Sequence, residues 1–479
     1  MFRRKSYCID KICHDKFKHA ILKCQTDCFC NFDNALFSAP RVPNSRAGPP
    51  CSRRMKYFLT SLVCLGLFTT CASQVSDERR QQLSQEPPVT VETAVGPLTL
   101  PSPFTTESAV KLSEIVDWPA GKTPVAPEGF RVERFADQLR HPRSTYVSPE
   151  GEVFVVESNT RNSANRIQRL IDENGDGTVD RREVLIDDLD QPFGMLVLNG
   201  YFYVANTDAT YRYPYTAGQE KLDATSAEEI LQTPPRGYNN HWTRNLLAGK
   251  DGRKIYVSVG SGSNVGENGM QAEVNRATIL EANPDGSELR EYATGLRNPV
   301  GMDWNPITGQ LWTAVNERDK LGDELVPDYL TSVQEGAFYG WPYSYYGQIR
   351  DPRWADDPHA DLVAEALVPD VPLGAHTASL GLAFYTADAF PEPYRNGAFV
   401  GQHGSWNRSK FSGYKVVFVP FDAEGKPKPP QDFLTGFIAD ADAGKVWGRP
   451  VGVTLHPDGS LLVCDDDAGI VWRVSAEAR

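Results

Sequence analysis

The chain has 479 residues, a formal net charge of −13 and an aromatic content of 10%, which is typical of a large globular protein with a substantial core. Such an acidic protein is not expected to bind nucleic acid, because contacts to phosphate groups need a basic face. Eight of the nine cysteines lie at or before Cys71 and the ninth is Cys464, which excludes a disulfide framework for the later part of the chain.

The first 72 residues contain an export signal preceded by an unusual leader. Residues 1–54 are basic, rich in cysteine and without hydrophobic periodicity, so we interpret them as a mis-assigned start or a disordered leader. Residues 55–72 have a basic start and an apolar run that is too short to span a bilayer but is typical of a signal peptide. Either a signal peptidase cleaves after Ala72, or Cys71 is the acylated residue of a lipoprotein. We therefore predict an exported protein, periplasmic or lipid-anchored at the periplasmic face of a bacterial membrane.

The rest of the chain divides into a linker and one large domain. Residues 73–117 are polar and rich in proline, which predicts a linker without a core of its own. Residues 118–479 are dominated by short runs of β-prone residues that begin at turns, which predicts an all-β domain.

Six pairs of strands recur in this domain. In three pairs the first strand opens with proline, a variable residue and glycine, as in Pro299-Val300-Gly301. The second strands of the pairs lie within residues 151–158, 200–208, 253–261, 309–317, 397–405 and 459–467. A β-sandwich is the alternative, but it does not explain a shared opening. The recurrence predicts a six-bladed β-propeller of four-stranded blades, with a long loop insertion after the fourth pair.

The starts of the first strands carry the candidate site. In a propeller the innermost strands line a central channel, so the residues at their starts meet at one mouth. These positions hold Arg143, Gln191, His241, Arg297, Asn298 and Arg449, and His403 ends a strand of the fifth pair. Clustered cations repel one another unless an anion lies among them, which predicts a polyanionic ligand. The alternative is that each arginine pairs with an acid of its own loop.

His241 is a candidate general base. Neighbouring cations should lower its pKa and keep the ring neutral, as a general base requires. The alternative is a structural histidine that is hydrogen-bonded to a loop carbonyl.

Two oxygen-rich segments suggest metal binding. Residues 172–183 fit the twelve-residue calcium loop, with the sharp turn at Gly177. Its ligand positions are Asp172, Asn174, Asp176, Thr178, Asp180 and Glu183. The flanking residues predict strands, so we expect a structural calcium site between two strands, or a metal-free turn as the alternative. The second segment, residues 316–324, is a looser pattern. Aromatic residues at 339–346 either stack on a flat ligand or pack the loop insertion.

Several motifs together resemble a known family. They are HPR (141–143), HWTRN (241–245), GLRNPVG (295–301), NERDKLGDE (316–324), YGWP (339–342), HGSWNRS (403–409) and GRPVG (448–452). This set is similar to the L-sorbosone dehydrogenase-like branch of the soluble sugar dehydrogenases that depend on pyrroloquinoline quinone (PQQ), over residues 120 to 479. The resemblance implies a six-bladed propeller that oxidises an aldose or a related, sorbosone-like sugar. Hydride passes from the anomeric carbon to PQQ, and electrons then pass to an acceptor such as a quinone or a cytochrome.

The resemblance also implies residue roles. His241 is the base that takes the proton of the anomeric hydroxyl, and Arg297 stabilises negative charge on the quinone. The implied contacts to PQQ, which carries three carboxylates, are Arg143, Arg297, Asn298, His403 and Arg449. A calcium ion is implied beside the cofactor at Glu317, Arg318 and Asp319, partly through main-chain carbonyls. Soluble glucose dehydrogenase orients its histidine with an aspartate in the following strand. This chain has residues 259–264 there, so a serine or a backbone carbonyl is expected in that role.

Two other classes of function stay open at this stage. One is an exported propeller that binds a ligand without catalysis. The other is a calcium-dependent lactone hydrolase, which would need acidic metal ligands in the channel. The basic residues at the channel positions count against the hydrolase.

Overall fold

The computed structural model describes residues 75–160, 163–234, 241–356 and 358–477. The leader (1–54) and the signal peptide (55–72) with Cys71 therefore lie outside the described residues. In the part of the chain that is described, none of the helices has the length and apolar character that crossing a bilayer requires.

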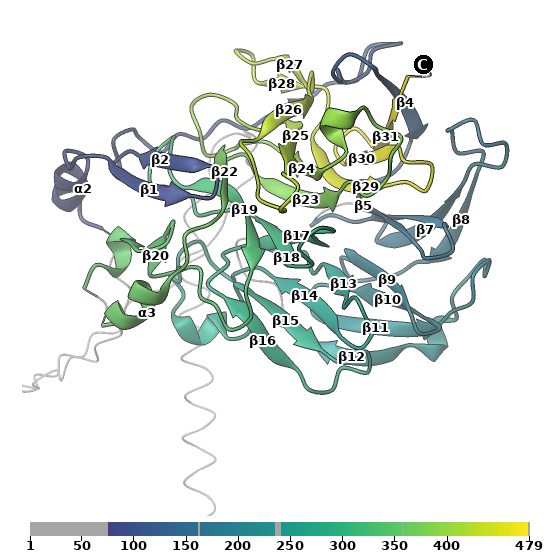
Figure 1. Cartoon of the computed structure of the whole chain (residues 1–479), viewed down its shortest axis with the longest axis horizontal. Coiled ribbons are helices and arrows are strands. Elements are labelled where there is room, and N and C mark those ends of the chain that lie inside the picture. The colour runs from purple at the N-terminus through teal and green to yellow at the C-terminus, as the bar shows by residue number, and fades with distance from the viewer. Residues whose placement is uncertain (1–74, 161–162, 235–240, 357, 478–479) are drawn as a thin grey trace, which may run out of the picture. The chain divides into compact units, whose positions relative to one another are not determined.

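The described residues form six four-stranded antiparallel sheets (Figure 1). The first three sheets contain β5 (Pro142–Val147), β6 (Val153–Glu157), β7 (Arg166–Ile171) and β8 (Arg181–Ile186); β9 (Gly194–Leu198), β10 (Tyr201–Ala205), β11 (Ala209–Pro214) and β12 (Glu228–Gln232); and β13 (Leu246–Ala248), β14 (Ile255–Val259), β15 (Thr278–Ala282) and β16 (Arg290–Thr294). The other three contain β17 (Pro299–Trp304), β18 (Leu311–Val315), β19 (Pro327–Val333) and β22 (Val371–Ala375); β23 (Ser379–Phe384), β24 (Gly397–Gln402), β25 (Lys415–Pro420) and β26 (Gln431–Leu434); and β29 (Pro450–Leu455), β30 (Leu461–Asp465), β31 (Ile470–Ala476) and β4 (Phe130–Ala136).

The six predicted strand pairs are the first two strands of these sheets. The first strands contact one another in the cyclic order β5, β9, β13, β17, β23, β29 and back to β5, and Figure 1 shows them towards the middle of the fold. The last sheet takes its outer strand β4 from the residues before the first sheet, which ties the two ends of the domain together. The described residues are thus nearly all-β, as predicted, and this arrangement is consistent with a β-propeller.

The recurring glycine of the first strands lets neighbouring sheets approach closely. A Cβ atom on Gly301 would lie 2.5 Å from the backbone nitrogen of Leu382 in the next sheet. A Cβ atom on Gly452 would lie 2.7 Å from the backbone oxygen of Arg143 and 2.8 Å from the Cα atom of Ser144. The proline-x-glycine repeat therefore marks the positions where the backbones of the first strands touch.

Replacing Gly452 by alanine is expected to destabilise the domain. The added methyl group meets backbone atoms of β5 that cannot rotate away, and overpacking of this kind costs about 1 to 3 kcal/mol. Denaturant unfolding of the variant measures this loss. Gly249→Ala is the matched control, because its Cβ atom would come no closer than 3.2 Å to a neighbouring atom. Equal stability of the two variants would contradict close packing of the first strands.

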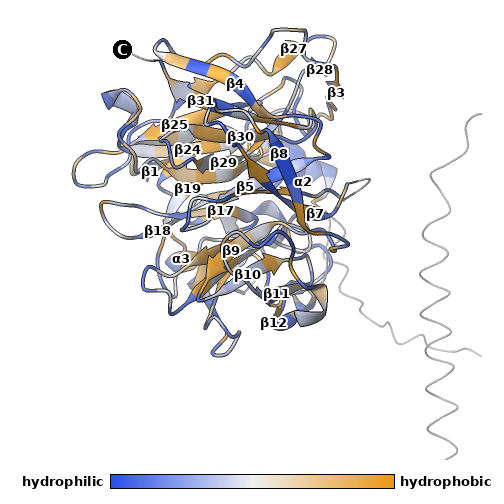
Figure 2. Ribbon diagram, turned by 90° about the vertical axis from the view of Figure 1, so that its right-hand side faces the viewer, coloured by the Kyte–Doolittle hydropathy of each residue, from blue (hydrophilic) through white to orange (hydrophobic). Residues whose placement is uncertain are grey.

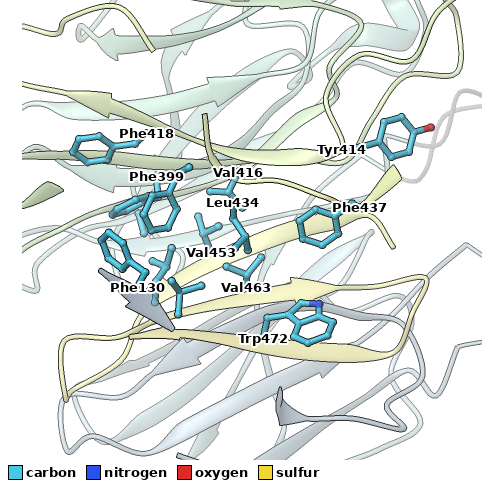
Figure 3. Close-up of a cluster of buried hydrophobic side chains, with 14 of the residues drawn as sticks. Phe130, Phe399, Tyr414, Val416, Phe418, Leu434, Phe437, Val453, Val463 and Trp472 are labelled. Carbon is cyan, nitrogen blue, oxygen red and sulfur yellow. The ribbon is translucent and has the colours of Figure 1, made fainter. Parts of the chain in front are cut away.

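The hydrophobic core lies between neighbouring sheets. The largest cluster joins the last two sheets and includes Phe130 of β4, Phe399 of β24, Phe418 of β25 and Trp472 of β31, which are drawn in Figure 3. Figure 2 shows hydrophobic stretches in the strands of these sheets, whereas β4 contains both hydrophilic and hydrophobic residues. Burial of the aromatic and β-branched residues that favour strands therefore also holds the sheets together.

Residues 75–117 differ from the linker that composition suggested. They form α2 (Asp77–Leu83), the hairpin β1 (Val89–Thr93) and β2 (Gly96–Leu100), and β3 (Glu114–Ile115), which pairs with β28 (Lys445–Val446) beside β27 (Ile438–Asp440). Leu100 is buried in the cluster that contains Leu321 and Tyr329. The backbone nitrogen of Asp323 donates to Thr106 Oγ1 at 2.7 Å. Short apolar stretches in the hairpin are thus enough to dock this segment on the sheets.

The predicted insertion separates β19 from β22. It contains β20 (Ser344–Tyr345), β21 (Ile349–Arg350), the 3-10 helix η3 (Pro352–Trp354) and α3 (Ala360–Glu365). The other 3-10 helices are η1 (Ala224–Ser226), η2 (Met270–Glu273) and η4 (Glu392–Tyr394). Tyr339, Trp341 and Tyr346 of the insertion are buried, and none of them lines the cavity described below. These aromatic residues pack the insertion, which was the second of the two expectations for them.

Candidate active site

A cavity of about 430 Å³ lies where the first strands of the sheets begin. The predicted catalytic and cofactor residues all line it, and they are Arg143, His241, Arg297, Asn298, His403 and Arg449. Gln191 occupies an equivalent strand position but is not among the lining residues; it is buried, and its Nε2 donates to the carbonyl of Asn159 at 3.1 Å. Residues far apart in the sequence thus meet in one place.

The cavity carries more positive than negative charge on its lining. The lining cations are Arg143, Arg297, Lys320 and Arg449, and the one acid among the described lining residues is Asp319. Each arginine also has an acid nearby: Arg143 with Asp466 at 2.5 Å, Arg297 with Asp319 at 3.5 Å and Arg449 with Asp467 at 3.5 Å. Arg297 and Arg449 pair with acids that follow the second strand of their own sheet, close to the alternative that the sequence left open, whereas the partner of Arg143 follows β30 of another sheet. All three pairs partly offset the repulsion among the arginines.

Arg297 is the most constrained of the three arginines. It is 2% exposed. Its Nη2 donates to Asn264 Oδ1 at 3.0 Å, and its Nη1 donates to the carbonyl of Glu317 at 2.5 Å. Asn264 Nδ2 in turn donates to the carbonyl of Asp319 at 3.1 Å. Asn264 therefore fixes Arg297 against the loop that carries residues 317–319.

Asn298 reaches the cavity through the space beside Gly260. A Cβ atom on Gly260 would lie 2.2 Å from Asn298 Oδ1 and 2.9 Å from His241 Cβ, so a side chain at Gly260 would displace both residues. Asn298 Oδ1 is buried and accepts no hydrogen bond among the described residues. A buried acceptor without a partner is stabilised when a ligand donates a hydrogen bond to it.

His241 is held through its Nδ1 atom. This nitrogen lies 3.1 Å from the carbonyl oxygen and 3.0 Å from the hydroxyl oxygen of Ser261, so both the serine and the carbonyl expected in this role are present. Burial and the nearby charge of Arg297 hold the pKa of His241 well below its ordinary value. The ring is therefore neutral at physiological pH, the direction that the cationic surroundings predicted.

Asp466 joins Arg143 to His403 on the other side of the cavity. It is 2% exposed, and its two oxygens lie 2.5 Å from Arg143 Nη1 and 2.8 Å from His403 Nε2. Burial alone would raise the pKa of Asp466, but the opposite charges of His403 and Arg143 outweigh it and hold that pKa well below the usual range. The Arg143 guanidinium also lies 5.3 Å from the ring centre of Trp242, a cation–π arrangement. Arg143 and His403 are therefore fixed in orientation.

Comparison with known proteins places this chain in a family. Residues 120–472 match the family model described as a domain of unknown function, DUF7133. The chain belongs to the DUF7133 family.

Relatives of this DUF7133 chain include named sugar dehydrogenases. An uncharacterized protein of Borreliella burgdorferi is 27% identical over 73% of the chain and 90% of that protein. The pyrroloquinoline quinone-dependent sugar dehydrogenase of Hypocrea jecorina is 24% identical over 76% of the chain and 91% of that enzyme. The holo form of the pyranose dehydrogenase PQQ domain from Coprinopsis cinerea superposes with a TM-score of 0.61 at 22% identity, covering 77% of the chain and 100% of that domain. The resemblance to the soluble PQQ-dependent sugar dehydrogenases is thereby confirmed.

The implied calcium ligands of the DUF7133 chain, residues 317–319, are already engaged by protein groups. The carbonyl oxygens of Glu317, Arg318 and Asp319 accept hydrogen bonds from Arg297, from the backbone nitrogen of Val326 and from Asn264. The Arg318 side chain pairs with Asp351 of the insertion. Glu317 is buried, and burial raises its pKa to about 7. A carbonyl oxygen has two lone pairs, so an ion bound by the Glu317 carbonyl would share that oxygen with Arg297.

The calcium-loop motif forms the connection between β7 and β8 and is folded by its own side chains. Asp172 accepts hydrogen bonds from the backbone nitrogens of Gly175 and Gly177, each at 2.7 Å. Asn174, Asp176 and Asp180 likewise accept backbone N–H groups within the loop. Glu183, the twelfth position, lies on β8, where its carboxylate pairs with Arg169 and Arg181. Among the described residues, no three acidic side chains of this loop come together as potential metal ligands, and calcium at this loop stays a prediction.

Several site residues of the DUF7133 chain were missed in the sequence. They are Asn264, Lys320, Trp406 and Asp466. Among the described residues, three potential side-chain metal ligands come together at His141, Asp466 and Asp467, but Asp466 is engaged by Arg143 and His403 there. The run Asp465-Asp466-Asp467 at the end of β30 was a signal, because polar residues at strand ends lie beside the cavity in the other sheets.

Proposed function

We propose that this chain is a PQQ-dependent dehydrogenase that oxidises an aldose or a related, sorbosone-like sugar. The observation that carries the proposal is the convergence, in one cavity, of a neutral histidine with three arginines. The relatives whose names state PQQ-dependent sugar or pyranose dehydrogenase activity support it. Within this proposal the six four-stranded sheets are the blades of one propeller, which the cyclic contacts of the first strands support.

The residues present suit PQQ, a flat molecule with three carboxylates. A cavity of about 430 Å³ lies in the range of small-molecule sites. Arg143 and Arg449 would bind carboxylates, because a guanidinium matches a carboxylate with paired hydrogen bonds. The buried Arg143 Nε donates no hydrogen bond among the described residues, which leaves a donor for such a ligand. When bound, PQQ supplies an ortho-quinone that accepts the hydride of the sugar.

The protein's own contribution is proton removal and charge stabilisation. Because the Nδ1 side of His241 faces Ser261, Nε2 is the atom that takes the proton of the anomeric hydroxyl. The low pKa of His241 keeps this base neutral. Arg297, held rigidly by Asn264, would stabilise negative charge that develops on a quinone oxygen. His403 and Asn298 would complete the cofactor contacts.

Calcium is a separate part of the proposal, and no step is derived through it. Calcium takes six to eight oxygen ligands, and the carbonyls of residues 317–319 are hydrogen-bonded within the protein. We propose these carbonyls as calcium ligands on the family resemblance. Export to the periplasm, with or without a lipid on Cys71, and a quinone or cytochrome as electron acceptor are proposed on the same basis.

The two alternatives receive less support. A lactone hydrolase needs acidic metal ligands in the channel, whereas Asp319 is the one acid among the described lining residues. A binding module without catalysis would share the arginines but would have no need of a neutral, oriented histidine. The dehydrogenase accounts for both features.

The test of the proposal is reconstitution with PQQ and calcium, followed by sugar-dependent bleaching of a dye acceptor. We expect bleaching that requires PQQ, sugar and intact His241. Binding of PQQ without bleaching by any aldose would favour the binding module, and failure to bind PQQ would overturn the proposal.

The charge state of His241 gives a pH prediction for the cofactor-free protein. A lowered pKa means that the ring stays neutral as the pH falls through 6.5, the ordinary value for histidine, and gains a proton only at lower pH. Nitrogen NMR of histidine-labelled protein, with His241→Gln to assign the signal, measures this titration. Adding PQQ should raise the pKa, because its carboxylates bring negative charge close to the ring. Protonation of the cofactor-free ring at or above pH 6.5 would contradict the electrostatics of the cavity.

A further inference from the structure

The hydrogen bonds of Ser261 determine which nitrogen of His241 carries the proton. The Ser261 hydroxyl donates its hydrogen to the carbonyl of Ser263 at 2.6 Å. Towards His241, the Ser261 hydroxyl and carbonyl oxygens can therefore only accept. Both lie about 3 Å from Nδ1, so Nδ1 must be the protonated nitrogen and Nε2 the basic one. The orientation of Ser261 thus decides whether His241 can act as a base.

A buried glutamate holds the residues that follow Ser261. Glu273, at the end of η2, is 5% exposed. One of its oxygens accepts the backbone N–H of Gly262 at 2.6 Å, and the other accepts the hydroxyl of Ser263. Ser263 Oγ accepts the backbone N–H of Gly266 at 2.9 Å. The carboxylate is therefore the common acceptor for two consecutive donors of the turn after β14.

A buried arginine lies beside the same glycine as this carboxylate. A Cβ atom on Gly262 would lie 3.2 Å from Arg276 Nε and 3.4 Å from Glu273 Oε1, so the two charged side chains flank this glycine. Arg276 is itself buried. A buried carboxylate with an arginine and two hydrogen-bond donors around it is part of the internal structure of the loop, unlike a solvated acid on the surface.

We propose that Glu273 is a positioning residue for His241, acting through Gly262, Ser263 and Ser261. In soluble glucose dehydrogenase an aspartate contacts the histidine directly and orients it. Here Glu273 would orient His241 indirectly, through the residues between them, and from a different element. Both donors need an acceptor, and only a carboxylate offers two acceptor oxygens in this place. The proposal rests on the proposed function, because it assigns a role in proton removal.

The substitution Glu273→Gln tests this role, since it keeps the shape and removes one acceptor. We expect kcat of the reconstituted enzyme to fall by about 10- to 100-fold, the size of loss that follows small misplacement of a catalytic group. The PQQ affinity should change by less than about twofold, because Glu273 does not line the cavity. Nitrogen NMR of the cofactor-free variant should show the Nε2–H form of His241 beside the Nδ1–H form that dominates the wild type. Glu273→Asp, which keeps both acceptors, should recover part of kcat.

The matched control is Glu281→Gln, because Glu281 is equally buried, binds Tyr256 and Arg290, and lies away from the cavity. We expect this variant to keep the wild-type kcat and histidine spectrum. An unchanged kcat and an unchanged tautomer in Glu273→Gln would overturn the role of Glu273, as would losses of kcat and PQQ affinity in equal measure. An inactive wild type that binds no PQQ would instead contradict the proposed function, so the two failures can be told apart.

Discussion

Replacing His241 by glutamine is expected to lower kcat by about 10²- to 10⁴-fold, the range that a positioned general base contributes. Glutamine can occupy a similar volume but cannot take the proton of the anomeric hydroxyl. In the wild type, the contacts of His241 Nδ1 with Ser261 fix the imidazole ring, so Nε2 is the nitrogen of this ring that is available as the base. Steady-state assays with PQQ, an aldose and a dye acceptor measure the loss.

The control for His241 is His456→Gln. His456 pairs with Asp458 and does not line the cavity, so we expect its replacement to leave kcat unchanged. The PQQ affinity of His241→Gln should remain within about tenfold of the wild-type value, because the arginines supply the charge. A His241→Gln enzyme with wild-type kcat would show that another group removes the proton.

Replacing Arg297 by alanine is expected to weaken PQQ binding by at least about 100-fold, or about 3 kcal/mol. This arginine is 2% exposed, and hydrogen bonds from a buried charged group are stronger than neutral ones. Its removal also leaves Asn264 Oδ1 and the Glu317 carbonyl without the donor that they share. Fluorescence titration of the protein with PQQ measures the affinity.

Two further variants separate charge from geometry at Arg297. Arg297→Lys keeps the charge but cannot reproduce the forked set of donors, so we expect an affinity between those of the wild type and the alanine variant. Arg253→Ala removes an exposed arginine that pairs with Asp251 and should leave the affinity unchanged. Equal PQQ affinity in the wild type and Arg297→Ala would contradict a cofactor site at this arginine.

The fold was predictable where a physical constraint repeats in the sequence. The proline-x-glycine motif recurs because Gly301 and Gly452 must pass close to the backbone of the next strand, and this repeat located the first strands. The N-terminal hairpin has no repeat and few apolar residues. Its composition therefore suggested a linker. In the structure one residue of the hairpin, Leu100, is fully buried in a cluster of the neighbouring sheets.

The site was predictable in its charged lining but not in its supporting groups. Arg143 and Arg449 stand at equivalent positions of the repeat, so topology brings them together. Asp465, Asp466 and Asp467 are consecutive and cannot be ranked by sequence. In the structure Asp465 accepts the backbone nitrogen of Arg449 at 2.8 Å, whereas Asp466 binds two cavity residues. Successive side chains at the end of a strand point in opposite directions, and this alternation gives the neighbouring aspartates different partners.

The calcium motif shows how much of a metal site a sequence spacing alone can predict. The spacing of residues 172–183 satisfies a loop pattern, but the pattern does not specify the backbone that follows. Because β8 begins at Arg181, Glu183 becomes a strand residue whose direction is set by the pleat and by its arginine partners. Calcium at this loop therefore stays a prediction.

The most direct test of the account is a single turnover without an external electron acceptor. Protein reconstituted with PQQ and calcium is mixed with an aldose under anaerobic conditions, and the absorbance of the oxidised quinone is followed. We expect the wild type to lose this absorbance in proportion to the bound PQQ, and His241→Gln to lose it at least about 100-fold more slowly. A quinone that stays oxidised in the wild type with every aldose tried, or that is reduced equally fast in both proteins, would contradict a sugar dehydrogenase built around His241.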